Sequence, residues 1–354
     1  MTGPAVEFQQ VTKRYGAVTA VSDVSFAIAR GSLVTLLGPS GCGKTSTLRL
    51  IAGLEHPSAG RVLIDGQDVT SASAAERDVS MVFQSYALFP HMTVLENVCY
   101  GLEASGVRRA DAMAQAAEKL ALVGLAGYER RLPSELSGGQ QQRVAVARAI
   151  VLEPKVLLFD EPLSNLDAKL RRRVREDIRE LQQGLGLTVV YVTHDQEEAL
   201  AVSDRIIVMH ASVIVQDGSP RALYEQPQNR FIADFIGNAN LLPVVVEGID
   251  GALARVRLGG AVLELAHRGI GPGPAELAVR PQGLSLRARP VEGREIAGRI
   301  AKAAYLGSHM EYVVALDGVG AEVLVTDAEV GRPLARGTEV AVAIAADAAV
   351  IVAG

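Results

Sequence analysis

Residues 32–46, SLVTLLGPSGCGKTS, place a short apolar run directly before a glycine-rich loop that ends in Gly43-Lys44-Thr45. The run Ser32–Leu37 is bounded by glycines, which is typical of a buried parallel strand. A helical pattern follows over Lys44–Leu54. The loop between them fits the phosphate-loop pattern G-x-x-x-x-G-K-[ST] in the strand–loop–helix context that the pattern requires. We therefore predict a nucleoside-triphosphate site here.

Each residue type in this loop suits phosphate binding. Glycines allow successive backbone N–H groups to turn toward an anion, and the helix start adds the positive end of its dipole. Lys44 supplies a positive charge for the β- and γ-phosphates, and the Thr45 hydroxyl can coordinate Mg²⁺. The predicted nucleotide-binding residues of the loop are Gly38, Pro39, Ser40, Gly41, Cys42, Gly43, Lys44, Thr45 and Ser46.

A second apolar run, Val156–Asp160, ends in two adjacent acids. Asp160, at the carboxyl end of a predicted strand, is placed to hold Mg²⁺ directly or through water. Glu161 can accept a proton from an attacking water, although the spacing also suits a helix-cap or salt-bridge acid. The guanine-reading pattern N-K-x-D does not occur in the chain, which argues against a GTPase.

A second candidate anion site is the start of a predicted helix at residues 136–143, LSGGQQQR. Ser137 and Gln140 have capping-box spacing, and Gly138 and Gly139 expose the first N–H groups of the helix. By itself this pattern indicates a well-capped helix. Beside a phosphate loop, it becomes a candidate for a second contact to the γ-phosphate.

The order of the predicted elements indicates two domains. Strand-like and helix-like stretches alternate as far as residue 236, which favours a layered α/β domain with a parallel sheet. Within it, residues 88–150 form a mainly helical subdomain, in which Thr93 and Glu96 have capping-box spacing. Residues 237–242 are a predicted linker. Residues 243–354 carry short, alternating, β-branched runs between turn clusters, which favours a small all-β barrel or sandwich.

Composition excludes several classes of protein. The 354 residues carry a formal net charge of −5, so the chain is no bulk electrostatic binder of nucleic acid. Aromatic residues make up only 4%, so aromatic side chains that could stack on bases or sugars are scarce. No apolar run is as long as a membrane-spanning helix, which argues against a membrane span. The N-terminus lacks the pattern of a signal peptide, and Cys42 and Cys99 have no metal or redox spacing, so we expect a cytosolic protein. Cys42 is either a thiol activated by the positive loop or, as we favour, a small buried residue.

These motifs resemble those of the ATP-binding cassette (ABC) family. GPSGCGKT, LSGGQ, and VLLFDEP followed by Ser164-Asn165-Leu166-Asp167 occur once each and in the family's order. Gln84 in MVFQSYALFP matches the glutamine loop, and His194 in YVTHDQEEA matches the switch histidine. The resemblance implies an α/β P-loop NTPase cassette, with a RecA-like core and a helical subdomain, that hydrolyses ATP with Mg²⁺.

The resemblance also implies roles for single residues. Tyr15 would stack on adenine, Gln84 would touch Mg²⁺ and the attacking water, and His194 would contact the γ-phosphate. Asp167 would lie at a dimer interface, because two cassettes face head to tail with ATP between one phosphate loop and the other subunit's LSGGQ. Without the resemblance, Tyr15 is interpreted as a packed turn residue, Gln84 as a polar residue at a strand end and His194 as a structural histidine.

The tail resembles the small OB-like β domain (TOBE-like) of importer cassettes, in residues 236–242, 279–282 and 305–308. This implies an energising subunit for solute import. The sequences of residues 175–182 and 201–204 look most like those of ferric iron importer cassettes. Importer cassettes for polyamine, for 2-aminoethylphosphonate or for another solute are the alternatives. A nucleic-acid ABC ATPase would carry long insertions or a second cassette, which the chain lacks. A regulatory role for the tail stays open.

The implied partners are a second copy of the chain, integral membrane permease subunits and, indirectly, a solute-binding protein, with no nucleic acid. The implied location is cytoplasmic, peripheral on the inner face of the cell membrane. We predict that the permease contacts the apolar stretch Ser85–Met92, in which Leu88 is taken as an exposed member. The basic run Arg171–Arg173 is followed by acids at helical spacing, so we interpret it as a solvated helix face.

Overall fold

The computed structural model describes residues 3–164, 166–287 and 295–352. The chain divides into two compact units, Met1–Pro220 and Arg221–Gly354, each with its own core. The domain limits given above stay predictions.

The first unit opens with a small antiparallel sheet in the order β2-β1-β4-β5. Its strands are β1 (Val6–Tyr15), β2 (Val18–Ile28), β4 (Ala59–Ile64) and β5 (Gln67–Asp68). The inward side chains of this sheet, among them Phe8 and Phe26 with stacked rings, pack with helix α1 (Lys44–Ala52) in one core. Helix α1 ends where Gly53 adopts a left-handed conformation, which is common after a helix.

A six-stranded sheet forms the centre of the first unit, in the order β10-β9-β3-β8-β7-β6. The contacts from β9 to β6 are all parallel, and β10 is antiparallel. The strands are β3 (Leu33–Leu37), β6 (Val79–Val82), β7 (Val156–Asp160), β8 (Val189–Thr193), β9 (Arg205–His210) and β10 (Val213–Gly218).

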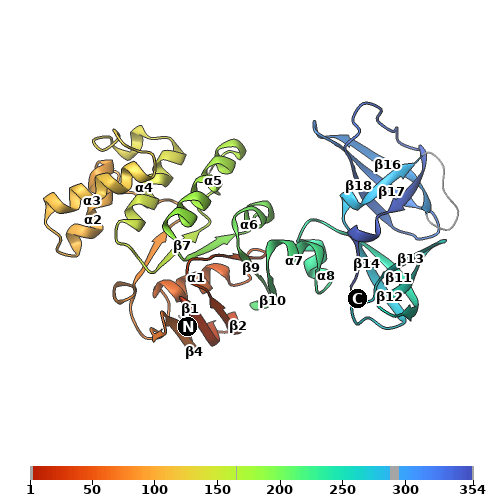
Figure 1. The fold of residues 1–354 in the computed structure, drawn as a ribbon, viewed down its shortest axis with the longest axis horizontal. Helices are drawn as coiled ribbons and strands as arrows, with labels where there is room; N and C mark the ends of the chain where they lie inside the picture. The colour runs from red at the N-terminus through yellow and green to blue at the C-terminus, as the bar shows by residue number, and fades with distance from the viewer. Residues whose placement is uncertain (1–2, 165, 288–294, 353–354) are drawn as a thin grey trace. The chain divides into compact units, whose positions relative to one another are not determined.

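Both faces of this sheet are buried, which explains the unbroken apolar runs of its strands. On one face, Val34 and Leu36 join the core that contains α1. On the other, Leu33 and Phe159 pack against α4 (Gly138–Ile150) and α5 (Ala168–Leu185). Helix α6 (Gln196–Val202) follows β8. The predicted α/β fold is therefore confirmed (Figure 1).

A helical part lies between β6 and β7 in the chain and contains α2 (Val94–Ala104), α3 (Arg109–Leu122) and α4. The three helices share a separate apolar core, as their places in Figure 1 suggest. The predicted capping box is present at the start of α2, where Thr93 and Glu96 bond to each other's backbone. Buried Asn97 fixes the preceding loop by bonding to backbone groups of Phe89, Met92 and Thr93.

The second unit contains two short helices, α7 (Pro220–Glu225) and α8 (Arg230–Phe235), and two five-stranded antiparallel sheets. One sheet has the order β13-β12-β11-β14-β20 and the other β15-β19-β16-β17-β18. Their inner faces share a single core of mostly Val, Leu and Ile side chains, so the predicted all-β tail is confirmed. None of the helices within the described residues is long and apolar enough to cross a membrane.

The strands of the first sheet are β11 (Asn240–Asp250), β12 (Leu253–Leu258), β13 (Ala261–Ala266), β14 (Gly273–Val279) and β20 (Ala349–Val352). Those of the second are β15 (Leu284–Arg287), β16 (Glu295–Tyr305), β17 (Met310–Leu316), β18 (Glu322–Asp327) and β19 (Glu339–Ile344).

Candidate functional site

The candidate site lies along the carboxyl edge of the six-stranded sheet. The strands β3, β8, β7 and β6 are consecutive neighbours, and a predicted site residue follows or ends each of them. The phosphate loop follows β3, His194 follows β8, Asp160 ends β7 and Glu161 follows it, and Gln84 follows β6. The carboxyl ends of neighbouring parallel strands meet at one edge, which is where open α/β sheets bind ligands.

The phosphate loop requires glycine at two of its positions because the chain around it comes too close for a side chain. A Cβ atom at Gly38 would lie 2.2 Å from the Met209 carbonyl oxygen. One at Gly43 would lie 2.3 Å from the Ala20 carbonyl oxygen, and Gly43 also has a φ of +106°. Gly43 immediately precedes α1, so the close approach of Ala20 admits only glycine where the loop enters the helix.

Lys44 is held at the inside of the loop. Its side chain is 5% exposed, and its Nζ atom donates to the carbonyl oxygens of Gly38 at 2.7 Å and Pro39 at 2.8 Å. Within the described residues, Nζ of Lys44 is held by neutral carbonyl groups and forms no ion pair, although its charge acts on the nearby carboxylate of Asp160. Its charge therefore remains available to an anion that enters the loop.

Cys42 is buried, and burial raises the pKa of its thiol despite the nearby Lys44. A raised pKa keeps the thiol protonated and unreactive at neutral pH. Of the two readings of Cys42, the structure therefore supports the small buried residue.

Thr45 and Asp160 form a pair of oxygen ligands that suits a magnesium ion. The Thr45 hydroxyl lies 3.5 Å from an Asp160 carboxylate oxygen and donates to it. Burial, and then the charge of Glu161, raise the pKa of Asp160. Removal of a carboxylate from water in this way disfavours its charged form, which a cation would stabilise. Mg²⁺ commonly takes one or two protein ligands and completes its shell with water and phosphate oxygens, so these two residues fit it.

Glu161 and His194 face each other across the ends of β7 and β8. The Nδ1 atom of His194 lies 3.1 Å from the Oε2 atom of Glu161. Glu161 has a φ of +45°, an uncommon conformation for a residue other than glycine. Such backbone strain often marks functional positions. The structure thus brings the predicted base and the predicted switch histidine into direct contact.

Gln84 is connected to the backbone of Glu161 through hydrogen bonds of Ser164. The Gln84 amide nitrogen donates to the Ser164 hydroxyl at 3.1 Å, and this hydroxyl donates to the Glu161 backbone carbonyl at 3.0 Å. Ser164 therefore links the end of β6 to the end of β7. Sequence reasoning assigned no role to Ser164 by itself, and only its position four residues after Asp160 could have suggested one.

Arg171 is a second residue whose place sequence reasoning missed. It donates to the backbone carbonyl of Leu166 at 3.2 Å and to the Asp195 carboxylate at 3.3 Å. Asp195 directly follows His194 and caps α6, so Arg171 ties the loop before α5 to the histidine's segment. Its neighbour Arg172 instead faces solvent and pairs with Glu176 at 3.2 Å, as the interpretation of a solvated helix face expects.

The predicted second anion site lies at the start of α4. Ser137 and Gln140 form the expected capping box with each other. A Cβ atom at Gly139 would lie 2.9 Å from a methyl carbon of Leu170, so glycine allows this helix start to pack closely against α5. The described hydrogen bonds of Ser137 and Gln140 do not join them to the phosphate loop.

The described contacts of Tyr15 and Asp167 do not join them to Glu161 or His194. Tyr15 ends β1 in the antiparallel sheet, its side chain is 42% exposed, and the Lys13 ammonium lies 4.8 Å from its ring centre. Asp167 is exposed and caps α5, where its carboxylate accepts the Leu170 N–H at 3.0 Å. An exposed ring and an exposed helix cap are both able to contact a ligand or a second chain.

The stretch Ser85–Met92 is less exposed than the sequence suggested. Tyr86 is 6% exposed, and half-buried Leu88 packs against both the sheet core and the helical core. The choice of Leu88 as an exposed member was therefore wrong, because the side chain bridges two cores. The exposed aromatic side chains nearby are Phe83 and Tyr100, at 38% and 46% exposure, and Tyr100 packs 4.7 Å from the Phe89 ring centre.

Comparison with known proteins agrees with this arrangement. Residues 21–164 match the ABC transporter family, and residues 277–352 match the TOBE domain. The chain is 60% identical over 339 residues to the Fe(3+) ions import ATP-binding protein FbpC 1 of Rhizobium meliloti (strain 1021), which covers 96% of this chain and 95% of that protein. It is 51% identical over 319 residues to the Fe(3+) ions import ATP-binding protein FbpC of Escherichia coli (strain K12), at 90% and 89% coverage.

Solved structures show the same cassette. A cassette of Clostridium perfringens that is part of an ABC transporter complex matches with a TM-score of 0.59 and 26% identity, over 63% of this chain and 92% of that one. A dimeric post-hydrolysis state of an ATP-binding cassette bound to ADP and Pi matches with a TM-score of 0.55 and 33% identity, over 61% and 99%.

Proposed function

The chain belongs to the family of ABC transporter ATP-binding proteins, and from this premise we propose that it hydrolyses ATP to energise the import of ferric iron. The observation that carries the ATPase activity is the convergence of Lys44, the Thr45–Asp160 pair and the Glu161–His194 pair on one sheet edge. The choice of iron is supported by relatives more than 50% identical along most of the chain, which are named for Fe(3+) import.

The phosphate loop would bind the β- and γ-phosphates of ATP. Its N–H groups and the start of α1 face the anion, and Lys44 adds its buried positive charge. On binding, the Lys44 ammonium would exchange the carbonyl oxygens of Gly38 and Pro39 for phosphate oxygens. A charge-assisted bond of this kind is stronger than one between an ammonium and a neutral carbonyl.

Thr45 and Asp160 would hold Mg²⁺. When bound, the ion would offset negative charge on the phosphate oxygens. Gln84 was also predicted as a ligand, and its amide side chain ends beside Ser164 at the same edge of the sheet.

Glu161 would accept a proton from the water that attacks the γ-phosphate. His194 holds Oε2 of Glu161 through its Nδ1 atom, which fixes the orientation of the carboxylate. When both ring nitrogens of His194 carry a proton, the second would donate to a γ-phosphate oxygen. The Ser164 hydroxyl donates to the backbone carbonyl of Glu161 and accepts from the amide of Gln84.

One chain would contribute only part of each nucleotide site. The capped start of α4, with Ser137, Gly138, Gly139 and Gln140, presents backbone N–H groups, and its own hydrogen bonds leave it apart from the phosphate loop. We propose that it serves the phosphate loop of a second copy in a head-to-tail dimer. Exposed Asp167 would lie at that interface, and exposed Tyr15 would stack on adenine.

Transport requires a membrane partner, and we propose that integral permease subunits provide it. The chain would then be cytoplasmic and peripheral on the inner face of the membrane, and would meet the solute-binding protein only through the permease. Phe83 and Tyr100, exposed beside the segment that follows Gln84, are the proposed contact.

The experiment that tests this function measures uptake of radioactive ferric iron by cells whose own copy is deleted. Cells that carry the natural chain should take up iron, and those that carry Glu161→Gln should not. Glu197→Gln, a like change on α6, is the control. Normal iron uptake in the deletion strain, with uptake of a polyamine or of 2-aminoethylphosphonate lost instead, would refute iron as the solute.

A further inference from the structure

Tyr15, the residue proposed to stack on adenine, has one side of its ring covered by a lysine. The Lys13 ammonium lies 4.8 Å from the ring centre, within the distance at which a cation is attracted to an aromatic face. The Lys13 side chain is only 12% exposed, whereas Tyr15 is 42% exposed. The ammonium therefore lies on the protein side of the ring, and the solvent side stays open to a second flat group.

Lys13 is itself held in place by two groups that follow α1. Its Nζ atom lies 2.7 Å from a carboxylate oxygen of Glu55 and donates to the backbone carbonyl of His56 at 2.8 Å. The hydrogen bond from Lys13 holds the pKa of the Glu55 carboxyl below its usual range, and a smaller contribution from Tyr15 has the same direction. A lysine fixed at its ammonium has lost the freedom that this long side chain usually keeps, so it gives the ring a fixed support.

This support is joined to the helix that follows the phosphate loop. The backbone N–H groups of Leu54 and Glu55 both donate to the Arg49 carbonyl, at 3.1 Å and 3.3 Å. Arg49 lies in the last turn of α1, and the phosphate loop leads into the first turn of the same helix. The contacts from Tyr15 through Lys13 and Glu55 to α1 therefore fix the position of the ring relative to the phosphate loop.

We propose that Lys13 is a positioning residue, anchored by Glu55, that holds the Tyr15 ring ready for the base of the nucleotide. Lys13 thereby sets how much more tightly the site binds a nucleoside phosphate than a phosphate without a base. This role deepens the proposed function and rests on it. A ring that is already held in the orientation that a base requires loses less freedom when the base binds, so the affinity for the nucleotide is higher.

The test compares ADP with pyrophosphate by isothermal titration calorimetry of the full chain, since only ADP carries a base. Lys13→Met keeps a long side chain but removes its charge. It should weaken ADP binding by about 3–10-fold, the size expected for a lost contact between a cation and a ring and for a ring that is no longer held. Pyrophosphate should bind as before. In ATP hydrolysis, KM should rise by the same factor at an unchanged kcat, which a loss of folded protein would not produce.

Further variants test whether Lys13 acts through the ring. Lys13→Arg should keep the preference for ADP, because a guanidinium retains the charge, binds carboxylates and stacks on aromatic rings. In a chain that carries Tyr15→Ala, Lys13→Met should cause no additional loss of ADP affinity, because the ring on which Lys13 acts is absent. If Lys13→Met does not fold, Lys13→Gln, which keeps N–H donors without the charge, serves for the same comparison.

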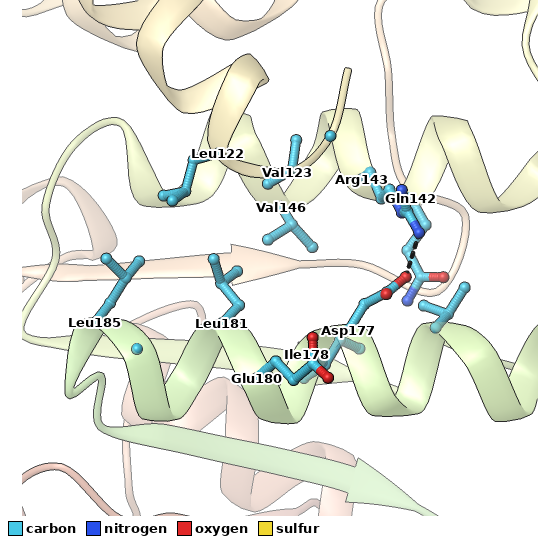
Figure 2. Close-up of a pocket in the computed structure, with 13 residues that line it drawn as sticks. Leu122, Val123, Gln142, Arg143, Val146, Asp177, Ile178, Glu180, Leu181 and Leu185 are labelled. Atoms are coloured by element: carbon cyan, nitrogen blue, oxygen red, sulfur yellow. Dashed lines mark hydrogen bonds and ion pairs between the residues drawn. The ribbon is translucent and has the colours of Figure 1, made fainter. Parts of the chain in front are cut away.

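The matched control removes a cation from a similar ion pair elsewhere in the first unit. Arg143 of α4 pairs with Asp177 of α5, as the dashed line in Figure 2 shows. The side chains of that pair are 30% and 35% exposed, so they are partly buried like those of Lys13 and Glu55. Arg143→Met should leave the ratio of the two Kd values, for ADP and for pyrophosphate, unchanged. An equal change of this ratio in Arg143→Met would overturn a specific role of Lys13.

The outcomes separate the role of Lys13 from the proposed function. Normal ADP affinity in Lys13→Met, or an equal loss with and without the Tyr15 ring, would overturn the role of Lys13 and leave the proposed ATPase supported. A natural chain that binds ADP no more tightly than pyrophosphate would overturn Tyr15 as the contact to the base, and the role of Lys13 with it. A natural chain that binds neither compound would overturn the proposed function itself.

Discussion

The Nδ1 atom of His194 lies 3.1 Å from the Oε2 atom of Glu161, although 33 residues separate them in the chain. They meet because β7 and β8 are neighbours in a parallel sheet, and each residue comes directly after its strand. A histidine in contact with a carboxylate can fix the orientation of that carboxylate, which is how His194 would assist Glu161 as a general base.

Replacement of Glu161 by Gln should slow ATP hydrolysis by roughly 10²–10⁴-fold, the usual contribution of general-base catalysis. The amide keeps the size of the side chain but cannot accept the proton. ATP should still bind, and the dimer should accumulate in its closed form, as seen by size-exclusion chromatography with ATP. Turnover within twofold of the natural rate would exclude this role.

His194→Ala and Glu161→Gln should not be additive. Because His194 is predicted to act with Glu161, the double variant should hydrolyse ATP at about the rate of the slower single variant. Steady-state rates of the four proteins measure this coupling. Independent losses, which multiply in the double variant, would show that the observed contact has no catalytic consequence.

Lys44→Ala should abolish ATP binding and turnover, since it removes the buried charge opposite the β- and γ-phosphates. Equilibrium binding of a fluorescent ATP analogue measures the effect. Lys302→Ala, at an exposed position of the tail, is the control. Normal affinity in Lys44→Ala would mean that the loop is not the principal phosphate site.

Asp160→Asn should stabilise the nucleotide-free protein while it abolishes Mg²⁺-dependent hydrolysis. Burial raises the pKa of Asp160 above its unfolded value, so the folded state favours the protonated form and the carboxylate costs stability at neutral pH. We expect Tm to rise by about 1–3 °C at pH 7.5.

The increase in Tm caused by Asp160→Asn should become smaller as the pH falls. The natural protein is stabilised relative to Asp160→Asn as pH falls through the raised pKa, so the difference in Tm should shrink toward acid pH. Thermal scans of both proteins from pH 7.5 to about pH 3.5, below the ordinary pKa of an aspartate, check this. A difference that widens as pH falls would contradict the assigned direction of the pKa.

Tyr100→Asp should leave ATP hydrolysis unchanged and abolish co-purification with the permease. The Tyr100 side chain is 46% exposed, so the change does not bury a charge. Tyr305→Asp, at another exposed tyrosine in the tail, is the matched control. Leu88→Asp is unsuitable because Leu88 packs against two cores. Normal iron uptake with Tyr100→Asp would remove this surface as the docking site.

Most of the fold could be predicted from the sequence, because its signals are local. The strand Val156–Asp160 lies where its apolar run predicts it, and the capping box at Thr93 forms with Glu96 as the spacing indicates. The helix predicted to end at Leu54 ends at Ala52, because Gly53 takes a left-handed conformation. That difference is within the usual uncertainty of a helix end.

The sequence by itself determined the chemistry of the phosphate loop, since residues 38–45 are contiguous and carry the complete phosphate-loop pattern. Only the tertiary structure decided which other side chains meet. Sheet order brings Ser164 to Gln84, and the packing of α5 brings Arg171 to Asp195. It also buries Gln142, whose amide has no hydrogen-bond partner among the described residues, and places Leu88 between two cores. Burial and contact depend on segments far apart in the chain, and no local pattern records them.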